Sequence, residues 1–91
     1  MTITEFQAVE TADQSWSAIQ KSLWHDSKGD WQKAHDLIDH LDTSEAAHVH
    51  AYLHRKEGDL WNAQYWYNRA NQPLPNLSLD AEWAELFKLY V

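Results

Sequence analysis

The sequence predicts an all-α fold made of two helix–turn–helix units and a C-terminal capping helix. Apolar residues recur at helical spacing along almost the whole chain, and no run of alternating apolar and polar residues reaches the length of a strand. Only two glycines interrupt the pattern, each between one apolar stripe and the next. We therefore expect one helical domain over residues 1–91, with units at about 15–41 and 44–71 and the capping helix at about 78–90.

The first main helix is predicted at about residues 12–27. Its inner face is marked by an apolar stripe of Trp16, Ile19 and Leu23. Thr11, followed three residues later by Gln14, has the pattern of a capping box, in which two side chains satisfy free backbone N–H groups at a helix start. The first ten residues either form a short turn of helix capped through Thr4 and Gln7 or stay loose.

Four more stripes predict the remaining helices. They consist of Trp31, Ala34, Leu37, Ile38 and Leu41; of Ala46, Val49 and Leu53; of Leu60, Ala63, Tyr67 and Ala70; and of Leu79, Trp83, Leu86, Phe87 and Tyr90. We expect Asp42 and Glu45 to form a capping box at the start of the second of these, and Ser78 to cap the last.

The two glycines indicate a duplication. Gly29 and Gly58 lie 29 residues apart, and each is followed by an aspartate. Glycine at such a point adopts the left-handed conformation that ends a helix, and the aspartate then caps the next one. The same shift carries His25 onto His54. Because one helical hairpin cannot bury its apolar side alone, we expect the two copies to stack.

This unit resembles the tetratricopeptide repeat, which also has a Gly-Asp turn, a small residue inside its second helix, an aromatic residue one turn later and a following proline. The matching residues are Gly58, Asp59, Ala63, Tyr67, Ala70 and Pro75. The resemblance covers about residues 15–75 and implies stacked hairpins with a groove for a peptide or protein. The spacing of 29 is shorter than the usual 34, and His25 and His54 stand where that repeat usually has tyrosine.

Two longer stretches are similar to the signature of a family of small bacterial helical proteins. They read WHDSKGDWQKAHDLID and HVHAYLHRKEGDLWNAQYWYNRANQP, between about Trp24 and Pro73. No activity is established for that family, so the similarity implies no catalytic residue.

The composition excludes several function classes. Seven basic against 14 acidic side chains give a net charge of -7, which matches neither nucleic acid nor an anionic membrane. There is no cysteine, so disulfides, thiolate metal sites and cysteine nucleophiles are excluded. We see no secretory signal and no apolar run of membrane-spanning length, and we expect a cytoplasmic location.

Histidine is the residue type that most suggests a site, with six in the chain. His50 and His54 lie four apart on one helical face, and Glu57 follows one turn on, so together they could hold a divalent metal such as zinc or nickel. His25 is expected to approach from the neighbouring helix. The alternative is that His25 and His54 are hydrogen-bonded between helices as structural residues. We expect no other cofactor.

A second candidate site is the concave face that the tetratricopeptide comparison implies. Its residues are Glu45, His48, Tyr52, Arg55 and Lys56. Such a group could hold a carboxylate, for instance the C-terminus of a peptide. The alternative is that Arg55 pairs with an acidic neighbour in the same chain.

The stripe that begins at Leu60 leaves Trp61, Tyr65 and Trp66 partly outside its apolar face. Either the last helix covers them with Trp83 and Phe87, or they form an exposed patch that another molecule covers, which leaves a homodimer open. Since no complete catalytic constellation is present, we expect an interaction module that binds a peptide or protein partner without catalysis. The alternative is a histidine-centred site for a metal or small ligand, with or without catalytic activity.

Overall fold

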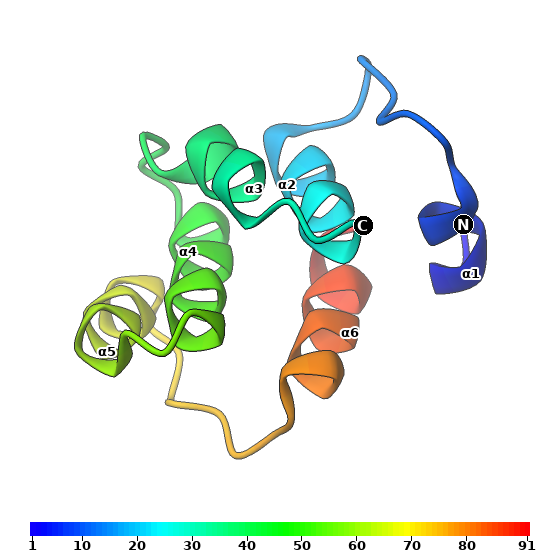
Figure 1. Cartoon of the computed structure of the whole chain (residues 1–91). Coiled ribbons are helices and arrows are strands. Elements are labelled where there is room, and N and C mark those ends of the chain that lie inside the picture. Colours follow the sequence, from blue (N-terminus) through cyan, green and yellow to red (C-terminus); the bar gives the residue numbers. More distant parts are fainter.

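The computed structural model describes residues 1–91 and contains helices only (Figure 1). The six helices are α1 (Ile3–Ala8), α2 (Ala18–Ser27), α3 (Trp31–Ile38), α4 (Ser44–Lys56), α5 (Leu60–Ala70) and α6 (Leu79–Tyr90). The prediction of an all-α fold is confirmed.

Helix α4 lies in the middle of the molecule, and α2, α3, α5 and α6 all contact it (Figure 1). Its residues from Ala46 to Leu53 are all buried. This stretch includes three polar side chains, those of His48, His50 and Tyr52. Because a buried polar group without a partner is costly, each of them needs a hydrogen-bonding partner inside the protein.

The two predicted glycine turns have the same geometry. Gly29 has φ 83° and Gly58 has φ 89°, both in the left-handed region. The next residue donates its N–H to the carbonyl of a histidine five residues earlier, Asp30 to His25 at 3.0 Å and Asp59 to His54 at 2.9 Å. Each aspartate then accepts a hydrogen bond from the third backbone N–H of the following helix. The glycine stop and the aspartate cap are thus confirmed in both places.

The main core joins the N-terminal segment to α2, α3, α4 and α6. Its fully buried members are Phe6, Leu23, Ala34, Ile38, Leu53 and Leu86. Phe6 anchors α1, because its ring stacks on Trp16 with centroids 4.9 Å apart and meets Phe87 edge-on at 5.3 Å. A smaller cluster of Ala51, Ala63 and Tyr67 holds α5 against α4.

Three helix starts differ from the predictions. Helix α2 begins at Ala18 with a capping box of Ser17 and Gln20, so the predicted start at Thr11 with Gln14 is wrong. Trp16 lies before this helix, because its ring packs on Phe6 instead of joining the stripe. Thr43, not the pair Asp42 and Glu45, caps α4. Helix α1 is capped by Thr2 and Glu5, not by Thr4 and Gln7. Ser78 caps α6 as predicted.

Replacing Gly58 by alanine should destabilise the protein through its backbone alone. A Cβ at this position would meet no atom within 4 Å, but the positive φ is strained for any L side chain. We expect a loss of about 1–2 kcal/mol in the free energy of unfolding, measured in urea, and a similar loss for Gly29→Ala. The control is Asn71→Gly at φ 58°, which should be neutral or stabilising. Unchanged stability in both alanine variants would contradict this account.

Candidate metal centre

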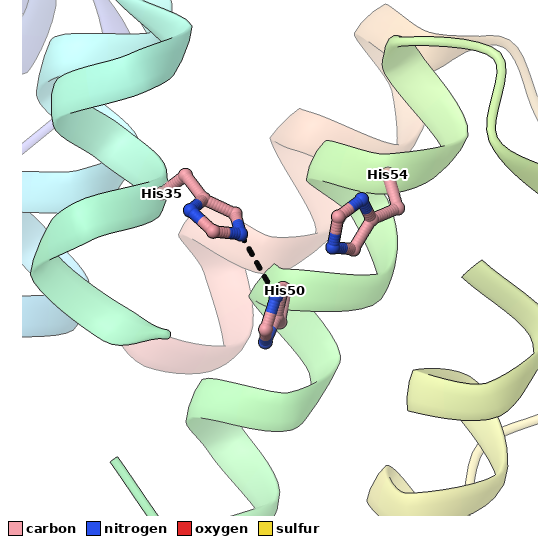
Figure 2. A group of neighbouring side chains, drawn as sticks. All are labelled: His35, His50 and His54. Carbon is pink, nitrogen blue, oxygen red and sulfur yellow. Dashed lines mark hydrogen bonds between the residues drawn. The ribbon is translucent and has the colours of Figure 1, made fainter. Parts of the chain in front are cut away.

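Three histidines from two helices converge between α3 and α4 (Figure 2). One ring nitrogen from each of His35, His50 and His54 lies within 4.8 Å of the others. The Nε2 atoms of His35 and His50 are 3.0 Å apart and share a hydrogen bond. His50 and His54 stack with ring centroids 4.7 Å apart, as expected for residues one turn apart on α4.

His35 takes the place that the sequence analysis gave to His25. The ring of His25, in the last turn of α2, meets Trp24 at a centroid distance of 5.0 Å and lines a separate cavity. It is outside the three-histidine group. The reason is topological: α3, the second helix of the first hairpin, packs on α4, and His25 belongs to the first helix. Glu57 contacts the group only through His54.

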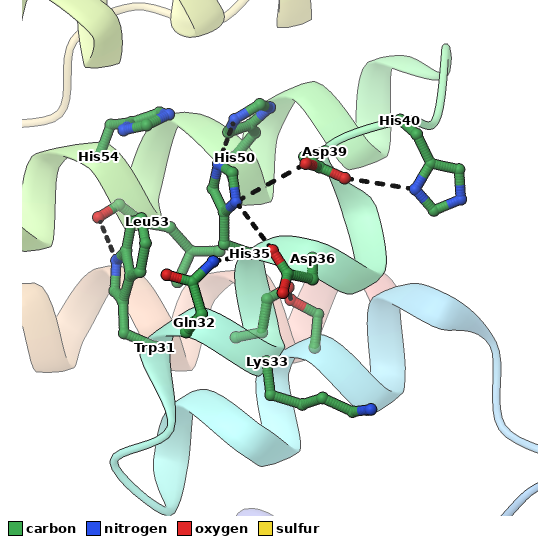
Figure 3. Close-up of polar contacts among 12 residues, drawn as sticks. Trp31, Gln32, Lys33, His35, Asp36, Asp39, His40, His50, Leu53 and His54 are labelled. Carbon is green, nitrogen blue, oxygen red and sulfur yellow. Dashed lines mark hydrogen bonds and ion pairs between the residues drawn. The ribbon is translucent and has the colours of Figure 1, made fainter.

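Carboxylates lie against the outer nitrogens of two of the rings, and Figure 3 shows the two beside His35. His54 Nδ1 is 2.7 Å from Glu57 Oε1. His35 Nδ1 lies 3.7 Å from Asp36 and 3.8 Å from Asp39, and this buried atom makes no hydrogen bond. A carboxylate beside Nδ1 favours the tautomer with the proton there, which leaves the lone pair on Nε2. In both rings, Nε2 is therefore the nitrogen available to a metal.

Two tryptophans fix the orientation of the rings. Trp31 stacks on His35 with centroids 4.9 Å apart and rings 15° from parallel. Its Nε1 donates to the carbonyl of Leu53 at 2.7 Å (Figure 3). On the other side, Trp66 of α5 stacks on His50 at 4.0 Å. The imidazoles are thus held between aromatic walls, which limits the conformational freedom lost when a ligand binds.

The protonation state of the central ring suits metal binding. His50 is 5% exposed, and its burial, together with the nearby His35 and His54, lowers its pKa to about 4. His50 is therefore neutral at pH 7. Metal binding requires a neutral imidazole, which His50 is, but the proton shared between His35 Nε2 and His50 Nε2 must move to the other nitrogen of its ring before both can bind a metal.

The separation of the His35 and His50 nitrogens is close to that between two ligands of a tetrahedral metal, and the His54 nitrogen lies within 4.8 Å of both. With Zn–N bonds of about 2.0–2.1 Å, two ligand nitrogens are separated by about 3.3 Å. The 3.0 Å between His35 and His50 differs from this by a few tenths of an ångström. Three protein nitrogens would leave one position for water or another ligand. His35 and His54 also belong to two other groups of potential ligands, with Asp36 and Asp39 and with Glu57 and Asp59.

The residues predicted to line a peptide groove make contacts within the chain. Tyr52 donates to Asp26 at 2.7 Å, and Lys56 donates to the same carboxylate at 2.8 Å. Arg55 donates to Glu82 at 2.9 Å and also to the carbonyl of Leu77. His48 Nδ1 is 2.8 Å from the hydroxyl of Tyr90, and Glu45 is exposed at the start of α4. Most of these partners come from helices α2 and α6. Arg55 pairs with the acidic side chain of Glu82 in the same chain, which is the alternative that the sequence analysis gave for this residue.

Two buried carboxylates were not singled out from the sequence. Asp26 is 3% exposed and Glu82 is 2% exposed. Glu82 accepts hydrogen bonds from Arg55 and, at 2.5 Å, from the Tyr67 hydroxyl. Burial and these carboxylates raise the pKa of Tyr52 and Tyr67. No local pattern separates such acids from surface ones, because their partners lie on other helices.

Trp61 and Tyr65 of α5 are not covered by the last helix, whereas Trp66 packs within the chain on His50. Trp83 and Phe87 of α6 pack on Phe6 instead. Trp61 is 77% exposed and Tyr65 is 43% exposed. The expectation that α6 covers them is therefore wrong, and the alternative of an exposed patch describes the structure.

Comparison with family models, curated proteins and solved structures finds no match for this chain. None of its helices combines the length and the apolar character needed to cross a membrane.

Removing the Glu82 carboxylate should destabilise the fold strongly. Glu82→Ala leaves Arg55, whose side chain is 18% exposed, without its partner and leaves the Tyr67 hydroxyl unsatisfied. We expect a loss of about 3 kcal/mol in the free energy of unfolding in urea. The matched control is Glu85→Ala, an exposed position on the same helix, which should change it by less than about 0.5 kcal/mol. Equal effects of the two substitutions would contradict the role of Glu82.

The stability of the metal-free protein should fall in weak acid. Because the pKa of His50 is about 4 in the folded state against an ordinary 6.5, the unfolded chain binds the proton more readily. Stability is therefore full above pH 6.5 and declines as the pH falls toward 4, by at most about 1.4 kcal/mol per unit from this residue. Urea unfolding with a chelator present measures this, and His50→Gln should show a shallower slope. Identical slopes would contradict a buried neutral His50.

Proposed function

We propose that this protein binds a divalent transition metal through His35, His50 and His54. The observation that carries the proposal is the convergence of three imidazole nitrogens within 4.8 Å, two of them from rings whose other nitrogen faces a carboxylate. Carboxylate, histidine and metal in sequence is the usual arrangement at protein metal sites, because the outer carboxylate orients the ring and raises its basicity.

The donor set favours zinc or nickel over calcium or magnesium. Imidazole nitrogen suits zinc, copper, iron and nickel, and the harder cations take oxygen ligands. The acidic side chains of Asp36, Asp39 and Glu57 around the rings also favour a cation. In the metal-free state, the hydrogen bond between His35 and His50 satisfies the two central nitrogens, so the site is also compatible with a folded apoprotein.

A protein-binding role without catalysis is the second candidate, and the exposed aromatic residues of α5 favour it. The group of Glu45, His48, Tyr52, Arg55 and Lys56 is a poorer support for this role, since four of its five side chains already have partners within the chain. In this proposal the contact surface is therefore on α5.

Titration of chelator-treated protein with zinc or nickel tests the metal proposal. We expect one ion per chain by calorimetry and, at a hundredfold excess over the dissociation constant, about 2.7 kcal/mol of added stability. For a domain of this size that raises the melting temperature by at least about 10 °C. Nickel should also quench tryptophan fluorescence, because Trp31 and Trp66 stack on two of the ligand rings.

Matched histidine variants identify the ligands. His35→Gln and His50→Gln should each abolish the stabilisation by metal, and His25→Gln, outside the group, should retain it. Magnesium should have no effect in any variant. The proposal is wrong if zinc does not stabilise the wild-type protein, or if His25→Gln loses the effect while His35→Gln keeps it.

A further inference from the structure

The outward side of α5 forms a flat aromatic platform on the protein surface. We call this the α5 face; it consists of Trp61, Gln64, Tyr65, Asn68 and Arg69, all exposed. The rings of Trp61 and Tyr65 are 15° from parallel with centroids 6.3 Å apart. The Arg69 guanidinium lies 5.9 Å from the Tyr65 ring and 5.2 Å from the Trp66 ring. Arg69 also donates to the Tyr65 hydroxyl at 3.2 Å. Exposed aromatic residues of this kind mark interaction sites.

The charge distribution indicates what can approach this platform. The chain carries a net charge of -7, but α5 is the only one of the six helices without an acidic residue. Its single charged side chain, Arg69, is paired with the exposed Asp42 carboxylate at 3.2 Å, so this face carries no net charge. Two copies of the chain repel each other wherever their acidic surfaces meet. The α5 face is therefore where two copies can come together without net charge repulsion.

We propose that the α5 face joins two copies of this chain in a symmetric homodimer, with the two α5 helices antiparallel across a two-fold axis near Tyr65. Such an interface uses the same patch on both subunits. Trp61 and Arg69 each lie four residues from Tyr65, which is about 6 Å along the helix in opposite directions. In an antiparallel pair, Arg69 of each copy therefore faces the Trp61 ring of the other.

This pairing would supply complementary contacts. Arg69 over a tryptophan face is a favourable cation–π arrangement. Trp61, at 77% exposed, and Leu60, at 63%, would bury most of their remaining apolar surface. Helix α5 is only 11 residues long, so the interface is at the small end of the range for specific contacts. We therefore expect a reversible dimer with a dissociation constant on the order of micromolar.

Cross-linking tests the geometry directly, because the chain has no native cysteine. Gln64→Cys places one thiol on the α5 face, and Glu85→Cys places one on an exposed position of α6. With a short bis-maleimide and a chelator present, Gln64→Cys should form mostly covalent dimer and Glu85→Cys almost none. Equal yields, or more dimer with Glu85→Cys, would overturn the assignment.

Sedimentation equilibrium without cross-linker gives the affinity. Trp61→Ala should weaken the dimer about tenfold or more, and Leu89→Ala, which removes an apolar side chain 53% exposed on α6, should leave it unchanged. A wild-type monomer at all concentrations would overturn the proposal, as would a dimer insensitive to Trp61→Ala or one that forms only when metal is added. The chelator separates this test from that of metal binding.

Discussion

The enclosure of α4 by four other helices is the constraint on which the rest of the structure depends. From Ala46 to Leu53 this helix has no exposed side, yet its sequence carries two histidines and a tyrosine there. Each of these side chains hydrogen-bonds to a residue of another helix: His48 to Tyr90, His50 to His35 and Tyr52 to Asp26. Polar pairs between helices therefore fix which surfaces meet, as the apolar core alone would not.

The pair between His50 and His35 differs in kind from the other two. Tyr52 donates to a carboxylate that also accepts from Lys56, so that pair is complete without any ligand. The two imidazoles have no charged partner between them, and a third ring, that of His54, lies beside them. The carboxylates are on the outside of the group, beside Nδ1 of His35 and His54. The inner nitrogens of the group thus face one another with the acids outside it, which is the arrangement on which the metal proposal rests.

The sequence predicts those features that depend on neighbours along the chain. The glycine turns, the aspartate caps and the stacking of His50 on His54 follow from local spacing. Features set by packing between helices were missed. The repeat suggested His25, in α2, as the third ring of the group. However, α3 is the helix that places a histidine beside His50 and His54, and that histidine is His35. The predicted start of α2 was too early for the same reason. Trp16 packs on Phe6 of α1, and the helix begins after it, at Ala18.

X-ray absorption spectroscopy of the zinc-loaded protein tests the central claim most directly. If the three imidazoles bind one ion, the zinc edge should show nitrogen ligands at about 2.0–2.1 Å, with the multiple scattering of three imidazole rings. His35→Gln should reduce the imidazole count by one, and His25→Gln should leave it at three. A wild-type spectrum with oxygen ligands and no imidazole scattering would contradict the account.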